Sequence, residues 1–397
     1  MAAQRKTSRY VVPVAVAGIA AATIGLVPAL AASGDPDLPE ITAQQLIEKI
    51  AASDTQTLSG TFKVSTDLGL PAFDGLLGGI AGGAAGGEGS ADPSAQLTKL
   101  VSGTHTLKIA ADGPDRQKLT LLDGKEQYSI VHNGDEVWAY DSRSGEVFHE
   151  KGVEEAGEAP GQELPASPKQ LADEVLKAAG DTTSVTVGGT AKVAGRDAYR
   201  LVIEPKQQGS TVDSVTIAVD AATGTPLKFT LDSTSGGKPV VDAGFTKVDF
   251  GKPAASEFDF TVPEGAKVTE GDDIEKSHRD AGKDLEEEFG DFGLGGALGE
   301  GLGGGLAGGD KGEMNVIGEG WTTIARFDSG APAPKTDEAP KEVQGFLDSL
   351  GDKVSGKFGS GTVFKTKIVN ALMTDDGKVY VGAVTPQALV DAANAAK

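Results

Sequence analysis

The chain has 397 residues and a formal net charge of −22, with 56 Gly, no Cys and 5% aromatic residues. An acidic surface with no basic stripe disfavours nucleic acid as a partner. The absence of Cys excludes disulfides, thiolate metal sites and a lipid-modified cysteine. The length allows two or three domains of about 150 residues each, and the glycine content predicts that part of the chain is low-complexity loop.

The first 32 residues have the pattern of an export signal. Three basic residues, at positions 5, 6 and 9, precede an apolar run over residues 10–32, and Ala-Leu-Ala at 29–31 suits signal peptidase. We expect cleavage after Ala31, with an uncleaved anchor as the alternative, because about 22 apolar residues can span a bilayer. Both interpretations place the remainder outside the cytoplasmic membrane, either secreted or tethered to its outer face by residues 10–32.

Residues 41–149 predict one helix followed by a series of strands. Thr42 and Gln45 match a capping box, so a helix is expected over residues 43–52. A strand follows near residues 58–66, and a meander of strands resumes near residue 104. Asp-Gly at 123–124 and Asn-Gly at 133–134 provide the positive φ angles that hairpin turns require.

Alternation along these strands places nine apolar side chains on one sheet face. This face is either a ligand cavity or a filled core, and the sequence leaves both open. The nine candidates for contact with an apolar ligand are Leu58, Phe62, Val64, Leu107, Ile109, Leu119, Leu121, Tyr128 and Ile130.

A second set of strands follows an acidic loop over residues 150–165 and a short helix over residues 168–176. The strands are predicted over residues 185–193, 198–204, 212–219, 227–233, 240–250 and 257–262. Together with the first set this gives ten or eleven antiparallel strands and two helices between residues 41 and 263. Because no Gly- or Pro-rich boundary separates the two sets, a single curved sheet is expected.

Two glycine-rich blocks, at residues 69–91 and 290–312, interrupt this pattern. They are either compositionally biased insertions or segments that become ordered against an apolar surface, since each Gly costs a helix about 1 kcal/mol relative to Ala. A charged helix is predicted over residues 274–289. Beyond residue 314 the sequence predicts a small α+β module, with strands at 321–327, 363–373 and 378–384 and helices at 340–350 and 386–396.

No catalytic motif stands out. The four His, at positions 105, 132, 149 and 278, are scattered, although His105 and His132 lie on strands that could bring them together. Carboxylate pairs such as those at 154–155, 272–273 and 375–376 fall in predicted turns or linkers, where they stay solvated. We therefore expect no metal, no cofactor and no enzymatic activity.

Several segments resemble the LolA/RseB-like family of lipoprotein carriers and envelope regulators. They are Asn-Gly-Asp-Glu-Val-Trp-Ala-Tyr-Asp at 133–141, Val-Ala-Gly-Arg-Asp-Ala-Tyr-Arg-Leu at 193–201, Val-Asp-Ala-Ala-Thr-Gly-Thr-Pro-Leu at 219–227 and Phe-Asp-Phe-Thr-Val-Pro-Glu-Gly at 258–265. The resemblance implies an unclosed β-barrel of about eleven strands with helices over its open side. It further implies an apolar cavity for acyl chains or a lipoprotein signal, without catalysis. The tail from residue 321 is similar to the second domain of regulators that contact a membrane-bound anti-sigma factor.

The sequence therefore predicts an α+β protein whose curved antiparallel sheet forms an unclosed β-barrel, plus a small C-terminal α+β module. The expected organisation is a signal or anchor (1–32), a half-barrel domain (41–268) with a Gly-rich insertion (69–95), a charged and Gly-rich linker (269–313) and the module (314–397). The leading functional hypothesis is an exported carrier of a lipid or lipoprotein acyl chain. The alternative is an envelope regulator that contacts a membrane-bound regulatory protein through the module.

Overall fold

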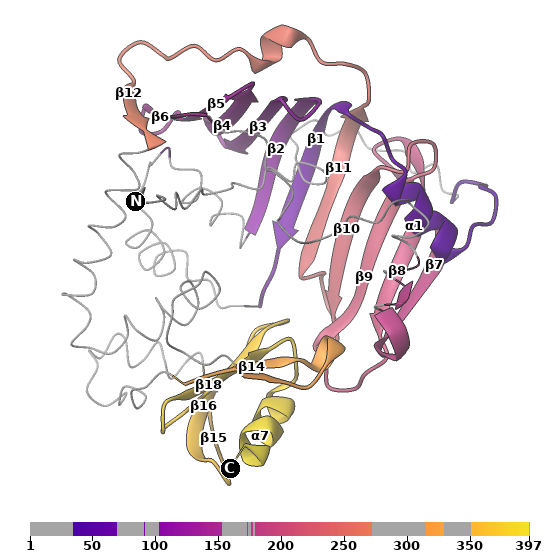
Figure 1. Cartoon of the computed structure of the whole chain (residues 1–397), viewed down its shortest axis with the longest axis vertical. Helices are drawn as coiled ribbons and strands as arrows, with labels where there is room; N and C mark the ends of the chain where they lie inside the picture. The colour runs from indigo at the N-terminus through magenta and orange to yellow at the C-terminus, as the bar shows by residue number, and fades with distance from the viewer. Residues whose placement is uncertain are drawn as a thin grey trace, which may run out of the picture.

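The structure, a computed structural model, describes residues 35–69, 91, 103–152, 173, 176–177, 179–271, 315–328 and 351–396. Within these residues the chain forms a curved sheet of twelve strands and a smaller sheet of six. Figure 1 shows the small sheet and its helix beside one end of the large sheet.

The large sheet has the strand order β12-β6-β5-β4-β3-β2-β1-β11-β10-β9-β8-β7. Its strands are β1 (Thr57–Thr66), β2 (Gly103–Asp112), β3 (Arg116–Asp123), β4 (Glu126–Asn133), β5 (Glu136–Asp141), β6 (Glu146–Lys151), β7 (Thr183–Val193), β8 (Arg196–Pro205), β9 (Val212–Asp220), β10 (Pro226–Ser233), β11 (Val241–Asp249) and β12 (Lys267–Glu270). The first and last strands of this order are not neighbours in the described sheet, so the barrel stays open. This confirms the predicted fold class.

Short turns hold the predicted meander in register. Gly124 and Gly134 have φ angles of 60° and 67°, the left-handed conformation that the Asp-Gly and Asn-Gly pairs predict. Leu119 of β3 lies directly opposite Ile130 of β4, as hairpin pairing requires. The turn chemistry therefore fixes which side chains share a face.

Helix α1 (Ala43–Ala51) begins with the predicted capping box. The backbone N–H of Gln45 donates to the Thr42 hydroxyl at 3.2 Å, and the N–H of Thr42 donates to the Gln45 side chain at 2.9 Å. Both bonds satisfy N–H groups that have no partner inside the helix. The helix is thus placed by its own sequence, and its buried Leu46 and Ile47 turn toward the sheet.

A strap over residues 250–266 crosses the convex face of the large sheet and leads into β12 (Figure 1). The sequence predicts a strand over residues 257–262, and this prediction is wrong: residues Ala255–Phe258 form the 3-10 helix η3. Lys118 donates to the carbonyl of Glu257 at 2.9 Å, and Phe258 is fully buried. Side chains rather than a neighbouring strand satisfy this backbone. Strand β12 then pairs with β6, in parallel and not in the antiparallel sense expected for the sheet.

The small sheet has the order β13-β14-β18-β17-β16-β15, with helix α7 against it. Its elements are β13 (Asn315–Ile317), β14 (Ile324–Asp328), β15 (Gly351–Gly356), β16 (Gly359–Phe364), β17 (Asn370–Thr374), β18 (Lys378–Gly382) and α7 (Pro386–Ala395). The described residues also form two short 3-10 helices, η2 (Gly180–Thr182) before β7 and η6 (Gly320–Thr322) before β14. Helix α7 confirms the prediction for residues 386–396.

Two strand predictions for this sheet need correction, and β15 was not predicted at all. Residues 363–373 do not form one strand, because a turn over residues 365–369 separates β16 from β17. The Thr366 hydroxyl accepts from the N–H groups of Ile368 and Val369 and so closes this turn. Residues 321–327 begin as η6 before β14, since the Trp321 indole is held by Thr183 at 2.8 Å.

Several predicted segments lie outside the described residues. These are the export signal (1–32), nearly all of both glycine-rich blocks, most of the helix at 168–176, and the helices at 274–289 and 340–350. The division into a half-barrel domain (41–268), a linker (269–313) and a module (314–397) stays a prediction.

Candidate apolar binding face

Strand register arranges the inner face of β2–β6 into rows that run across the sheet. The middle row is wholly apolar and consists of Ile109, Leu119, Ile130, Ala139 and Phe148, each directly opposite the next. With strands about 4.8 Å apart, a row across five strands spans roughly 19 Å. The sheet therefore presents an elongated apolar strip.

Polar residues flank this strip on both sides. One neighbouring row is Ala111, Gln117, His132, Val137 and Glu150, and the other is Leu107, Leu121, Tyr128, Asp141 and Glu146. Among the described strands β1–β6, no Lys or Arg occupies an inner-face position. The strip is therefore bordered by uncharged and acidic groups.

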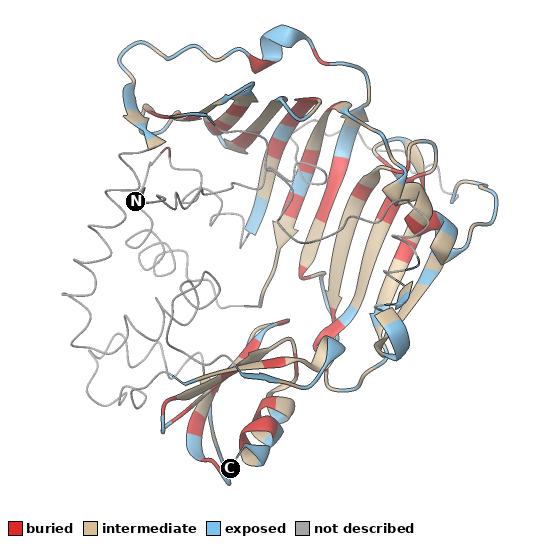
Figure 2. Ribbon diagram, viewed as in Figure 1, coloured by how far each residue is buried: buried red, intermediate tan, exposed pale blue. Residues whose placement is uncertain are grey.

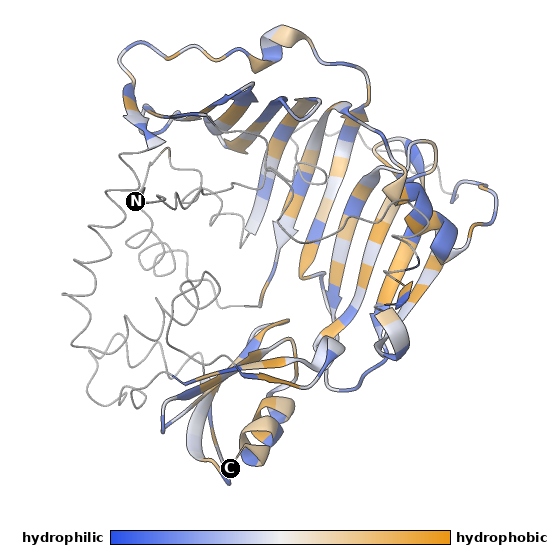
Figure 3. Ribbon diagram, in the orientation of Figure 1, coloured by the Kyte–Doolittle hydropathy of each residue, from blue (hydrophilic) through white to orange (hydrophobic). Residues whose placement is uncertain are grey.

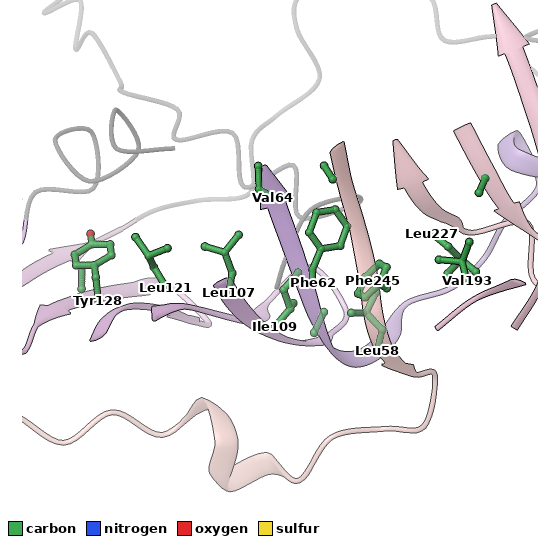
Figure 4. Close-up of a cluster of buried hydrophobic side chains, with 14 of the residues drawn as sticks. Leu58, Phe62, Val64, Leu107, Ile109, Leu121, Tyr128, Val193, Leu227 and Phe245 are labelled. Atoms are coloured by element: carbon green, nitrogen blue, oxygen red, sulfur yellow. The ribbon is translucent and has the colours of Figure 1, made fainter. Parts of the chain in front are cut away.

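The structure places all nine predicted side chains in this one region. Seven of them are buried, with Phe62 and Leu107 each only 1% exposed, while Leu119 and Ile130 are partly buried against the same cluster. Figure 4 shows Tyr128, Leu121 and Leu107 on the same side of their strands. The predicted grouping is observed, but no ligand is present to test its role.

Ten buried members of the same cluster were not among the nine candidates, and four of them lie on β5, β6 and β11. These four are Ala139, Phe148, Ala243 and Phe245. The Phe245 ring meets Phe62 edge-on, with centroids 5.0 Å apart and planes at 89°. The signal was available, because Ala243 and Phe245 alternate with other residues along β11, the strand that pairs with β1.

Helix α1 covers the other half of the inner face. Phe229 lies opposite both Ala243 and Ile217, and Ile217 lies opposite Leu201, so register carries the same face from β11 to β8. There, Leu46 packs with Leu201 and other buried side chains of β8 and β9. Across β1–β6, by contrast, the described buried cluster contains one residue outside the strands, Ala91, whose carbonyl accepts from the Tyr128 hydroxyl at 3.0 Å.

The segment at 219–227 that carries the family resemblance anchors α1. Asp220 is buried and accepts hydrogen bonds from Arg196 at 2.9 Å and from the Thr223 N–H and hydroxyl at 2.8 and 2.9 Å. Burial raises the pKa of Asp220, but Arg196 and Thr223 lower it by more, so the net pKa lies below its usual value. Gly224, at φ 76°, approaches the end of α1 so closely that a Cβ would collide with the Lys49 carbonyl. This turn therefore positions the helix.

On the convex face, a contact between a histidine and a carboxylate joins β12 to the sheet. His149 Nδ1 lies 3.0 Å from Glu270 of β12, and its ring stacks on Trp138 at 3.7 Å. Trp138 also stacks on Phe260 of the strap, with ring centroids 5.2 Å apart. His149 is only 5% exposed, so this group closes the strap onto the sheet and offers no open reaction site.

The two sheets meet through a polar and apolar interface. The turn at 365–369 contributes the Lys367 N–H, which donates to the Leu68 carbonyl at 2.7 Å, and the Lys367 ammonium, which lies 2.7 Å from Asp67. The hydrogen bond to Lys367 lowers the pKa of Asp67. Beside them, Ile368 packs on Val212 and Val240 of the large-sheet region. The small sheet is therefore docked on the large one.

Among the described residues, no group of three or more His, Asp or Glu could hold a metal ion. His105 and His132 do not meet, because β3 separates their strands and they belong to rows at opposite ends of the face. Asp375 and Asp376 lie at the β17–β18 turn, as the sequence predicts.

Comparison with known proteins gave structural matches alone. No family model and no curated protein matches the chain. The complex of MucA and MucB from Pseudomonas aeruginosa is 16% identical, covers 88% of this chain and 96% of that chain, and has a TM-score of 0.37. An uncharacterised conserved protein from Thermus thermophilus is 12% identical over 57% of this chain and 98% of that chain, with a TM-score of 0.31.

A LolA superfamily protein from Nitrosomonas europaea also matches, at 10% identity over 56% of this chain and 99% of that chain, with a TM-score of 0.22. MucB and a LolA-superfamily protein thus stand among the matches. The fold class itself follows from the strand order of the large sheet.

Within the part of the chain that the structure describes, the helices are all too short or too polar to pass through a bilayer.

Proposed function

We propose that this protein is an extracytoplasmic, non-enzymatic binding protein that holds a lipid or lipoprotein acyl chain against the inner face of β1–β6. The observation that carries the proposal is the uninterrupted apolar row from Ile109 to Phe148. Helix α1 lies over the other half of the face. A long apolar row across five strands suits a long apolar ligand.

The chemistry of the strip supports an acyl chain over a polar ligand. Figure 3 shows hydrophobic positions repeating along the strands, and Figure 2 shows that many of these positions are buried. Burial of apolar ligand surface stabilises a complex by about 25 cal/mol per Å², without any directional bond. Binding of this kind depends on shape and apolar area, which the strip provides.

A pair of enlarging substitutions tests whether the strip is a ligand site. Ala139→Leu adds volume at the centre of the strip, whereas Ala110→Leu adds the same volume on the opposite face of β2, where Ala110 is 2% exposed. Overpacking a filled core costs about 1–3 kcal/mol. We expect Ala110→Leu to lower the free energy of unfolding by this amount. We expect Ala139→Leu to abolish ligand binding and to leave the free energy of unfolding of the ligand-free protein nearly unchanged.

The measurements are native mass spectrometry and lipid extraction of the exported protein, and urea unfolding of the ligand-free variants. A wild-type protein that is reproducibly empty, together with equal destabilisation by both substitutions, identifies the strip as ordinary core and overturns the proposal.

A second candidate function is an envelope regulator that contacts a membrane-bound partner through the small sheet. One observation favours it: of the four large apolar side chains that are exposed in the described residues, Val316 and Val369 belong to this module. Deleting the module is a poor test, because Val212 and Val240 would lose the cover that Ile368 provides.

Photocrosslinking gives a cleaner test of this second function. A crosslinker at Val316 or Val369 should capture one membrane protein reproducibly in cells. The matched control is Val262 of the strap, which is exposed to a similar degree and should capture nothing. If the three positions behave alike, the regulator hypothesis loses its support.

A further inference from the structure

Two neighbouring side chains at one border of the apolar strip hold buried polar atoms without a partner. Gln117 Oε1 and His132 Nε2 are both inaccessible to solvent, and neither has a hydrogen-bond partner in the described structure. The two residues lie directly opposite each other on β3 and β4. Buried polar atoms are nearly always hydrogen-bonded, and leaving one unpaired is unfavourable, so this pair calls for a partner.

The hydrogen-bonding roles of this pair narrow the choice of partner. The Gln117 amide nitrogen donates to the Pro114 carbonyl at 3.2 Å, so its free oxygen faces the other way and can only accept. His132 Nε2 donates in one tautomer of the ring and accepts in the other. A hydroxyl group has the functionality that both atoms require, because it can donate to Gln117 Oε1 and accept from the Nε2–H of His132.

Charge around the pair disfavours an anionic partner. The same row ends in Glu150, and no Lys or Arg lies at an inner-face position of the described strands β1–β6. Arg143, in the β5–β6 turn beyond the opposite border of the strip, is already paired with Asp123 and Glu126. A phosphate or carboxylate beside Gln117 would be desolvated with no cation from the inner face of the described strands β1–β6 to compensate it.

The strip and the pair are adjacent. Leu119 and Ile130, which belong to the apolar row, lie two residues from Gln117 and His132 on the same strands and the same face. A lipid whose acyl chain lies on the row at β3 and β4 can therefore place its polar head at this border.

We propose, on the basis of the function proposed above, that Gln117 and His132 form a polar subsite that binds the hydroxyl group of an uncharged lipid head. The subsite selects acyl lipids with a free hydroxyl over lipids with an alkyl ester or a phosphate at that position. The ligand class of the strip is thereby narrowed to neutral, hydroxyl-bearing acyl lipids.

The test compares three lipids with the same acyl chain on the exported protein. Monooleoylglycerol carries hydroxyls, methyl oleate carries none, and oleoyl lysophosphatidate carries a phosphate; competition against a fluorescent acyl probe gives the affinities. Monooleoylglycerol should bind about tenfold more tightly than methyl oleate, the ratio expected for one or two net hydrogen bonds to buried groups. Lysophosphatidate should bind more weakly than monooleoylglycerol.

Gln117→Leu and His132→Leu should each reduce the preference for monooleoylglycerol and leave the affinity for methyl oleate unchanged or higher. The matched control is Gln127→Leu, the same substitution on β4 at an exposed position of the opposite face. It should keep the full preference. Urea unfolding verifies folding, and neither variant at the pair should be less stable, because each removes an unpaired buried atom.

The outcomes separate the two proposals. If monooleoylglycerol and methyl oleate bind equally to wild-type protein, the subsite is wrong and the acyl-binding function stands. Tighter binding of lysophosphatidate also overturns the subsite. If none of the three lipids binds, the proposed function fails, and the subsite fails with it.

Discussion

The two halves of the inner face of the large sheet have the same alternation but different surroundings. Over β7–β9, helix α1 packs Leu46 and Ile47 against the strands and closes a local core. Over β1–β6, the buried members of the described cluster come from strands, and the cluster continues onto β7–β11; Ala91 is its only described buried member outside a strand. An identical pattern of apolar residues thus serves a protein core in one half and a candidate ligand site in the other.

The difference lies in how each half is held together. The α1 half has an anchored cover, because the capping box fixes the start of the helix and the Asp220 turn fixes its end. The strip half has a continuous apolar row with polar borders. Stability is therefore expected to depend on the α1 half, and binding on the strip half.

The largest expected effect compares one deletion of apolar volume in each half. Leu46→Ala removes a fully buried side chain from a closed core and should reduce the free energy of unfolding by about 3 kcal/mol. Leu121→Ala should cost the ligand-free protein clearly less and should weaken acyl-lipid binding. Urea unfolding and lipid competition measure the two effects. Equal losses of stability would erase the distinction between the halves.

The next effect concerns the anchor of α1. Asp220→Asn removes the charge that Arg196 and Thr223 stabilise and should reduce the free energy of unfolding by about 2 kcal/mol, the scale of hydrogen bonds to a charged group. Arg143 in the strip half forms exposed ion pairs, so Arg143→Met, the control, should change stability by under about 1 kcal/mol. If Asp220→Asn leaves the free energy of unfolding unchanged, the turn does not hold the helix.

A smaller effect is expected at the start of the helix. Thr42→Ala breaks the capping box and should cost about 1 kcal/mol. Thr42→Ser keeps the hydroxyl and should restore most of the stability. Neither change should alter lipid affinity, and a Thr42→Ala protein with impaired lipid binding would show that the two halves are coupled.

The smallest expected effect is a pH dependence in the acid range. The folded-state pKa of Asp220 is lowered, so the stability it contributes is complete above the unfolded pKa of about 3.9 and is lost as pH falls toward the folded value. Wild-type protein should therefore lose stability below about pH 4 more steeply than Asp220→Asn. Urea unfolding at a series of pH values compares the slopes, and parallel curves would contradict the assigned ion pair.

Local signals predicted most of the fold of the large sheet. The Asp-Gly and Asn-Gly turns, the period-two alternation and the Thr42–Gln45 box each act within a few residues, so the elements β1 to β11 and α1 were foreseeable. The segment at 257–262 was not, because its backbone bonds to distant side chains such as Lys118. The break between β16 and β17 depends on the Thr366 hydroxyl, which accepts a hydrogen bond within the turn. In the sequence this signal is weaker than the strand propensity of the residues around it.

The sequence by itself determined which side chains share a face, since strand alternation and hairpin turns are local properties. It placed Phe62, Leu121 and Tyr128 together before any fold was known. Only the tertiary structure decided what lies against each part of that face, because cover by α1, the strap and the small sheet depends on contacts between residues far apart in the chain. Tertiary structure alone also revealed that the paired Gln117 and His132 hold buried atoms without a partner, since burial depends on what covers the strands, whereas their pairing follows from the β3–β4 turn.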